Sequence, residues 1–448
     1  MKHPFLPSSF LLLIVSQLIA CHAISCTRST GQETGKVTLG DERFEEYVPG
    51  LEGKRVAVFS NQSGIVGDKV KGSKLADALN ARGGCFLAGE EFDKIAGIPF
   101  LEPSEPGGKI EYGPHLVDVL LGKGVDVSLI ISPEHGFRGT ADAGEKVTSG
   151  KDEKTGVEIY SMYGGGSRNP GQEVMDKFDV LLVDIQDVGL RYYTYYVTMY
   201  HLIDACARFG KKVIVLDRPN PNGFYVDGPV LDMDLRSGVG WLPITTVHGM
   251  TLGELALMIN GEGWLDDGRK CDLEVVPCLS YTHSDKYSLI VPPSPNLKDM
   301  RAVYLYASTC YFEGTVVSLG RGTDHPFEMY GHPEMEGYSY SFIPRSMPGA
   351  KSPMYQDRTC NGADLRQKPL DQIWNERINL EYVVEAYNAL DMGGAFFGKN
   401  NFFDLLAGRK YFKEMILDGY EADDIKTRWK DDAVTFAARR QQYLLYPE

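Results

Sequence analysis

The chain has 448 residues, 43% of them hydrophobic, which is typical of a globular protein long enough for two domains. Acidic residues outnumber basic residues by 61 to 46, and the formal net charge is -15. Since no basic stripe is present to neutralise a phosphate backbone, nucleic acid is excluded as an expected partner.

Residues 1–26 have the pattern of an export signal. One lysine precedes an apolar run that is shorter than a membrane span, and small residues follow before Cys21. The tetrapeptide LIAC, which ends at Cys21, resembles a bacterial lipobox, in which the cysteine becomes the lipidated first residue. The alternative is ordinary cleavage a few residues later, near Cys26. We therefore expect an exported protein, either periplasmic or attached to the outer membrane through a lipidated Cys21.

Four apolar runs follow, and each ends at a polar corner that contains glycine. RVAVFS, VDVSLII, VLLVDI and KVIVLD lead into NQSG (61–64), SPEHG (132–136), QDVG (186–189) and RPNPNG (218–223). Runs that are apolar on both faces are typical of a parallel sheet covered by helices, and YYVTMYHLIDACARFG, closed by Gly210, fits a crossover helix. The sequence predicts an α/β domain with a Rossmann-like, mostly parallel sheet over residues 41–280.

The second half changes character, because residues 281–448 do not continue the alternation of strands and helices. They predict a smaller α+β C-terminal domain that completes the active-site cleft. The segment 310–327, CYFEGTVVSLGRGTDHPF, places Glu313, Arg321 and Thr323 among three glycines. Such a segment suits a loop that holds polar groups against a ligand, and it equally suits a Gly-rich surface hairpin.

Ligands of parallel sheets collect beyond the carboxyl ends of the strands, where all four polar corners lie. One Glu-His corner is more often a solvated turn, but four corners on one rim favour a functional site. No G-x-G-x-x-G follows a strand, GDKVKGS (67–73) lacks the P-loop lysine, and G-x-S-x-G and H-E-x-x-H are absent. The six cysteines outside the leader have no zinc spacing and are expected to be mostly buried thiols. We expect no cofactor and no metal.

A resemblance covers most of the chain. NQSG, SPEHGFRG with AGEKV, DIQDVGLRYYTYY, LDRPNPNG, VHGMTLGELA, PPSPN, CYFEGTVVSLGRGTDHPFE, FDLLAG and QYLLY occur in this order between about residue 50 and residue 446. This set resembles the bacterial exo-β-N-acetylmuramidases, the NamZ-like glycoside hydrolases. The resemblance implies an exported enzyme of cell-wall recycling or degradation that removes β-linked N-acetylmuramic acid from the non-reducing ends of peptidoglycan fragments. It also implies Glu134 as the leading catalytic residue.

Cleavage of a glycosidic bond needs an acid and a second group that stabilises or attacks the oxocarbenium-like centre. Glu134 is the best acid or base, and its apolar neighbours Pro133 and Phe137 would desolvate it. For the second group the order of preference is Asp187, Asp184, Glu313 and Glu145. Asp184 ends its strand and equally fits a helix cap. Because the acetamido group of the sugar is a further internal nucleophile, the stereochemical outcome stays open.

Muramic acid carries a lactyl carboxylate, and an arginine guanidinium is well suited to bind such a group through two parallel hydrogen bonds. At least one of Arg138, Arg191, Arg218 and Arg321 is expected to contact it, while the others pair with acidic neighbours. The aromatic run, which includes Tyr193 and Tyr195, fits either stacking on a sugar or packing of a helix onto the sheet. The other expected contacts to the substrate are Asn61, His135, Gln186, Asn220, Asn222, His248, Asn296, Glu313 and Thr323, with structural roles as the alternative for both histidines.

The sequence leaves open the role of residues 69–115 and one alternative function. Residues 69–115 extend a connection that is usually short in the family, as either a surface loop or a lid that shapes the exo-subsite. A non-catalytic, lipid-anchored protein that binds muropeptides or sugars is the alternative function, and it would use the same arginines and tyrosines without needing Glu134.

Overall fold

The predicted parallel sheet is confirmed, and it forms the centre of the fold in the computed structural model, which describes residues 37–134, 136–137, 149–162 and 169–448. In that part of the chain, seven strands form one sheet in the order β5-β6-β4-β1-β7-β8-β9. The strands are β1 (Arg55–Ser60), β4 (Asp126–Ser132), β5 (Gly150–Lys151), β6 (Glu158–Ser161), β7 (Val180–Asp184), β8 (Lys212–Leu216) and β9 (Asp272–Val276). All neighbours pair in parallel except the edge strand β5, which runs antiparallel to β6.

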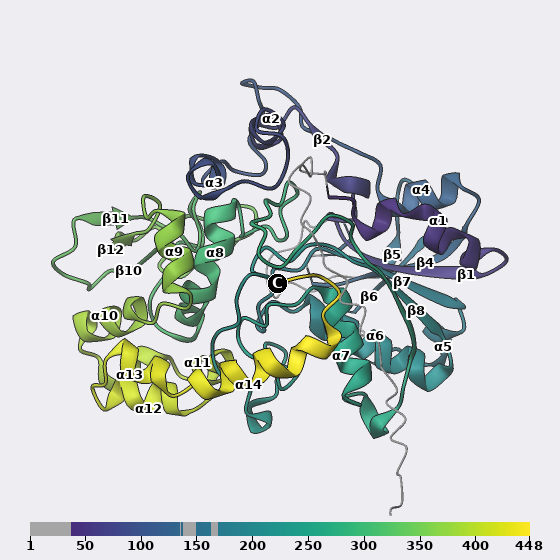
Figure 1. Cartoon of the computed structure of the whole chain (residues 1–448). Coiled ribbons are helices and arrows are strands. Elements are labelled where there is room, and N and C mark those ends of the chain that lie inside the picture. The colour runs from purple at the N-terminus through teal and green to yellow at the C-terminus, as the bar shows by residue number, and fades with distance from the viewer. Residues whose placement is uncertain (1–36, 135, 138–148, 163–168) are drawn as a thin grey trace, which may run out of the picture. The chain divides into compact units, whose positions relative to one another are not determined.

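Side chains that alternate along the strands pack into two separate hydrophobic layers. On one face, Val56 and Val58 pack with Leu116 and Leu120, whereas Ala57 and Phe59 belong to the other, larger cluster. Figure 1 shows α1 (Phe44–Tyr47) and α4 (Leu116–Gly122) on one face, and α5 (Gln172–Met175), α6 (Tyr195–Phe209) and α7 (Leu252–Gly261) on the other. The sheet is therefore covered on both faces, as its apolar strands require.

The crossover helix α6 has the bounds that the sequence predicts. It ends at Phe209, and Gly210 follows in the left-handed conformation with φ 64° and donates its N–H to the carbonyl oxygen of Cys206. Glycine adopts this conformation without steric cost, so it closes the helix. Because α6 is the helix that follows β7 in the chain, its first turn lies at the carboxyl end of β7, on the rim where ligands bind.

Residues 69–115 are more than a simple surface loop, and none of them lines the cavity described below. They contain β2 (Val70–Lys71), α2 (Lys74–Asn80), α3 (Gly89–Ala96) and β3 (Glu111–Tyr112). The buried Phe92 on α3 packs edge-on against Tyr304 and Trp374, with ring centroids 5.9 Å and 5.8 Å apart. The extension is therefore a packed layer against the C-terminal half of the chain.

The C-terminal half has α+β architecture, as predicted. Strand β12 (Cys360–Asp364) pairs antiparallel with both β10 (Met329–His332) and β11 (Tyr340–Phe342). The helices are α8 (Met300–Thr309), α9 (Leu370–Glu376), α10 (Glu381–Leu390), α11 (Phe402–Ala407), α12 (Tyr411–Leu417), α13 (Ala422–Thr427) and α14 (Lys430–Arg440).

The larger hydrophobic cluster runs without interruption from the central sheet into the C-terminal helices. Residues 37–448 accordingly form one compact unit, and a domain boundary near residue 280 stays a prediction. Five cysteines are buried thiols, as expected: Cys206, Cys271, Cys278, Cys310 and Cys360. Among the described residues, no helix combines the length and the apolar character that crossing a membrane requires.

Candidate active site

A cavity of about 410 Å³ opens where both halves of the chain meet beyond the carboxyl ends of β4 and β7. The N-terminal half contributes Glu134, Met162, the segment 192–195, Val197, Thr198, His201, Gly238 and Val239. The C-terminal half contributes Ser294, Asn296, Leu297, Tyr306, Glu313, Arg321, Phe327 and Phe402. The volume lies in the range of small-molecule sites. Among the sequence-predicted site residues, Glu134, Tyr193, Tyr195, Asn296, Glu313 and Arg321 line it.

Glu134 lies two residues beyond the end of β4 and is half-buried in the cavity wall. The hydroxyl of Thr194, at the start of α6, donates a hydrogen bond of 3.0 Å to its Oε2. Phe137 packs edge-on against His115, with ring centroids 4.8 Å apart. A side chain from a different strand corner therefore orients the Glu134 carboxyl.

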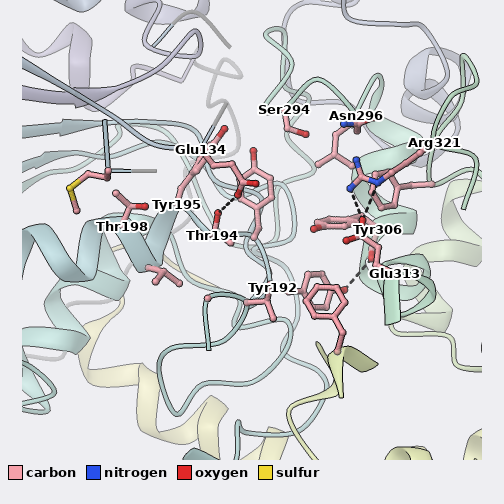
Figure 2. A pocket seen from close by; sticks show the side chains of 18 of the residues that line it. Glu134, Tyr192, Thr194, Tyr195, Thr198, Ser294, Asn296, Tyr306, Glu313 and Arg321 are labelled. Carbon is pink, nitrogen blue, oxygen red and sulfur yellow. Dashed lines mark hydrogen bonds and ion pairs between the residues drawn. The ribbon is translucent and has the colours of Figure 1, made fainter. Parts of the chain in front are cut away.

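An ion pair occupies the opposite wall. Figure 2 shows Glu134 and Thr194 on one side of the cavity and Arg321 with Glu313 on the other. The Arg321 guanidinium donates from Nη2 and Nε to Oε1 of Glu313, at 2.5 Å and 3.2 Å. The Arg321 side chain remains 27% exposed, so its charge is both held in place and open to the cavity.

The aromatic run contributes both to the cavity wall and to packing. Tyr193 and Tyr195 line the cavity, and their hydroxyls donate to the carbonyl oxygen of Pro293 at 2.7 Å and 3.0 Å. Asn61 donates from Nδ2 to the Tyr195 hydroxyl at 2.9 Å. Asn61 does not itself line the cavity and instead supports Tyr195 from behind. Tyr196 accepts from the backbone N–H of Trp241 and packs inside the protein.

Asp187 lies away from the cavity. Together with Gln186, Arg218 and Asn220 it lines a void of about 10 Å³, which is room for one water molecule and too small for a sugar. Its Oδ1 accepts from the Gly189 N–H at 2.7 Å, and Oδ2 has no hydrogen-bond partner among the described residues. Burial raises the pKa of Asp187 to about 7. The structure does not bring the preferred second carboxylate to the sugar-sized cavity.

Asp184 and Arg218 belong to a buried ionic cluster. The Arg218 guanidinium contacts Asp184 at 2.7 Å, and both Asp41 and Asp68 at 2.8 Å. All four side chains are at most 8% exposed. Three carboxylates therefore surround this one guanidinium beneath the rim. Arg218 was expected as a candidate to bind the substrate carboxylate in the cavity, and its position does not fit that role.

Arg191 is fully buried and acts as a cross-link within the protein. Its Nη1 donates to the carbonyl oxygens of Pro229 and Ile244, and its Nη2 to those of Leu406 and Ala407 at the end of α11. These bonds tie the C-terminal helices to the segment that follows the sheet. The position of Arg191 therefore does not fit a contact with substrate in the cavity.

The remaining predicted contacts support backbone segments outside the cavity. Gln186 donates to the Pro219 carbonyl, Asn220 to that of Met250, Asn222 to that of Val188 and Thr323 to that of Gly320. His248 accepts from the Met250 N–H, and burial lowers its pKa to about 3, which leaves it a neutral structural histidine. His135, Arg138 and Glu145 lie outside the described residues.

Several cavity residues escaped the sequence reasoning. Thr194, Thr198 and His201 recur at spacings of four and three, so they lie on one face of α6. This helical spacing next to a polar corner is a signal that could have identified them. Ser294 lies inside the PPSPN motif. Tyr306 is one of several apolar or aromatic positions on α8, and nothing in the sequence distinguishes it from its buried neighbours.

Comparison with known proteins identifies the family. The models described as exo-beta-N-acetylmuramidase NamZ, N-terminal and C-terminal, match residues 105–301 and 304–446. The chain is 34% identical over 338 residues to the peptidoglycan beta-N-acetylmuramidase NamZ of Bacillus subtilis (strain 168), which covers 72% of this chain and 80% of that protein.

Two crystal structures of DUF1343 family proteins from Bacteroides fragilis NCTC 9343 have a similar fold. One is 48% identical, with a TM-score of 0.77 and coverage of 92% of this chain and 100% of the other. The second is 25% identical, with a TM-score of 0.70 and coverage of 92% and 99%. Together with the matched models, these similarities show that the chain belongs to the exo-β-N-acetylmuramidase NamZ family.

Proposed function

We propose that this chain is an exo-acting β-N-acetylmuramidase, a glycoside hydrolase that releases terminal, non-reducing, β-linked N-acetylmuramic acid from peptidoglycan fragments. One observation carries the proposal beyond family membership. Glu134 faces the Arg321–Glu313 pair across a cavity of about 410 Å³. A candidate proton donor and a guanidinium thus share one small-ligand site, and the substrate offers a glycosidic oxygen and a lactyl carboxylate to them.

Glu134 is the proposed general acid. Protonation of the leaving oxygen requires a carboxyl held in a fixed orientation, because proton transfer depends on close alignment of donor and acceptor. The 3.0 Å hydrogen bond from Thr194 supplies that orientation. Thr194 is a positioning residue in this scheme, since it acts through Glu134.

Glu313 is the proposed second carboxylate. It lines the cavity, whereas Asp187 and Asp184 do not, and Arg321 holds it in place. An ionised carboxylate stabilises the positive charge that develops at the anomeric carbon. The acetamido group of the substrate is the competing source of the same stabilisation, and the stereochemical outcome of the reaction separates the two.

Arg321 is the residue proposed to bind the lactyl carboxylate of the substrate. Glu313 uses Nε and Nη2, and no acceptor among the described residues holds Nη1. A guanidinium binds a carboxylate through parallel N–H bonds, so a ligand carboxylate at the Nη1 edge completes the recognition. Removal of Arg321 is expected to reduce the preference for muramic acid over glucosamine.

The test is release of a chromophore from a β-linked N-acetylmuramic acid glycoside by the purified protein, with the N-acetylglucosamine glycoside as the specificity control. Glu134→Gln preserves the size of the side chain and removes the proton. We expect it to lose at least about 100-fold in kcat, the lower end of general acid catalysis. Glu336→Gln, an exposed glutamate outside the cavity, is the matched control and retains wild-type turnover.

Wild-type turnover in Glu134→Gln would refute the assignment of the acid. Absence of turnover in the wild type, combined with saturable binding of N-acetylmuramic acid, would favour the non-catalytic binding protein instead.

We further propose that the protein is exported and acylated at Cys21. The support is the sequence of residues 1–26, in which an apolar run ends at LIAC. Cys21→Ser is expected to move the protein from the membrane fraction to the soluble fraction of a bacterial host, whereas Cys26→Ser leaves it in the membrane fraction. A lipid adduct on any residue other than Cys21, detected by mass spectrometry, would contradict the lipobox assignment.

A further inference from the structure

A second cluster of ligating side chains lies next to the cavity. One ligand atom from each of Asp299, His325 and Glu328 falls within 4.8 Å of the others. The Nδ1 of His325 is 3.1 Å from Oε1 of Glu328. Asp299 follows the cavity residue Leu297 by two positions, and Glu328 directly follows the cavity residue Phe327, so the cluster lies close to that wall.

The cluster contains two buried carboxyl groups, one of which has an oxygen without a hydrogen-bond partner among the described residues. Asp299 and Glu328 are each 1% exposed. The Oδ1 of Asp299 accepts from the Ala302 N–H at 2.9 Å, while its buried Oδ2 has no hydrogen-bond partner in the described part of the chain. A buried polar atom without a partner is costly, and a second carboxylate beside it adds repulsion.

The neighbouring cations have partners elsewhere. Arg301 pairs with Asp93 at 2.9 Å. Arg366 pairs with Asp364 at 2.8 Å. Lys298 donates from Nζ to the carbonyl oxygen of Thr323 at 2.9 Å. Because each of these cations is bonded to another acceptor, a bound cation would balance the charge of the cluster more directly than they do.

We propose that Asp299, His325 and Glu328 bind a divalent first-row transition-metal cation, Zn²⁺ or Mn²⁺. Two ligand atoms bonded to one metal at about 2.1 Å lie roughly 3.0 Å apart in octahedral geometry and roughly 3.4 Å apart in tetrahedral geometry, and His325 Nδ1 lies 3.1 Å from Glu328 Oε1. One imidazole with two carboxylates is a donor set that suits these ions, whereas Mg²⁺ and Ca²⁺ favour oxygen ligands alone. The His325 side chain is 31% exposed, which gives the ion a route from solvent.

The bound cation would connect two segments that shape the cavity. Asp299 is the N-cap of α8, which carries Tyr306, while His325 and Glu328 belong to the segment that also carries Arg321 and Phe327. Bridging them fixes the distance between these parts of the wall. No metal was expected from the sequence, because the six cysteines outside the leader lack zinc spacing.

The experiment is metal titration of the protein purified without a metal-affinity column, stripped with EDTA and dialysed. Isothermal titration calorimetry with ZnCl₂ and, separately, MnCl₂ is followed by elemental analysis after desalting. We expect about one equivalent of at least one of the two ions to remain bound. The melting temperature should rise by roughly 3–5 °C at a metal concentration 100-fold above the dissociation constant.

Two variants and one control make the titration specific. Asp299→Asn keeps an acceptor for the Ala302 N–H and removes a charged ligand, and Glu328→Gln removes the other. Both are expected to weaken binding at least about 10-fold. Asp324→Asn makes the same charge change at an exposed position of the same loop and should bind as the wild type does.

Three outcomes would overturn the proposal. The first is a wild type that neither retains an ion nor changes its melting temperature. The second is undiminished binding in both ligand variants, which would place the ion elsewhere on this acidic chain. The third is a wild type without bound metal together with a raised melting temperature in Asp299→Asn, the signature of a shared proton.

Discussion

The buried ionic cluster around Arg218 should lose far more stability when the arginine is removed than when one carboxylate charge is removed. One guanidinium faces Asp41, Asp68 and Asp184 at 2.7–2.8 Å, and all four side chains are at most 8% exposed. Arg218→Met would leave three buried carboxylates without a countercharge. Loss of one partner of a buried pair costs about 3–5 kcal/mol, so we expect a loss of at least about 4 kcal/mol, a large part of the 5–15 kcal/mol that stabilises a typical protein.

Asp184→Asn is expected to have a much smaller effect. The amide oxygen still accepts from Arg218 Nε, and the Oδ2 position has no hydrogen-bond partner among the described residues. One of three mutually repelling charges is removed. We expect a change within about 1 kcal/mol, so the two variants should differ by about 3 kcal/mol, or more than 100-fold in the unfolding equilibrium.

The assay is urea unfolding followed by tryptophan fluorescence at pH 8 and pH 4.5. Burial raises the pKa of Asp41 and of Asp68 above the usual range, so each folded carboxyl binds a proton more readily than the unfolded one. Stability is then lost as the pH rises, and the penalty of Arg218→Met should be smaller at pH 4.5. Equal destabilisation by Asp184→Asn and Arg218→Met would refute this reasoning, because the carboxylates would then not be in excess.

Three further predictions test other parts of the structure. Burial raises the pKa of Asp187 to about 7, so folding stability should fall between pH 4 and 7, and Asp187→Asn should flatten that decline in urea titrations by up to a few kcal/mol. Thr194→Val should lower kcat about 10-fold with little change in KM, whereas Thr198→Val, on the same helix face, should keep kcat. Gly408→Ala places a Cβ 2.3 Å from Arg191 Nη2, so it should destabilise by at least about 1 kcal/mol more than Gly210→Ala, where no atom lies within 4 Å; equal unfolding midpoints would contradict this clash.

The central sheet could be predicted from sequence because its signal is local. Runs such as RVAVFS are apolar on both faces, and the structure places them as β1, β4, β7 and β8 in one parallel sheet. Strands β6 and β9 are partly exposed along their length, so they lack a continuous apolar run and were not predicted. The packing of residues 69–115 depends on contacts of Phe92 with Tyr304 and Trp374, which lie more than 200 residues further along the chain and give no local signal.

The site was only partly predictable, because a motif does not reveal which way its side chains point. The corner after β4 directs Glu134 into the cavity, whereas Asp187 in the neighbouring corner turns into a void for one water molecule. Four arginines were equivalent by sequence. Burial distinguishes the described three, because Arg191 and Arg218 are enclosed and Arg321 is open to the cavity.

The buried polar residues behind the cavity explain how its walls keep their positions. Tyr193 and Tyr195 are bonded to Pro293, the Tyr192 hydroxyl donates to Tyr306 and Ala307, and Arg191 holds the end of α11. Each bond crosses from the N-terminal to the C-terminal half, and each contributes about 1 kcal/mol. Separation of the two halves would break all of them at once. These bonds link the parts of the described wall that carry Glu134 to the parts that carry Arg321, so the residues proposed to act on the substrate are cross-linked through the protein interior.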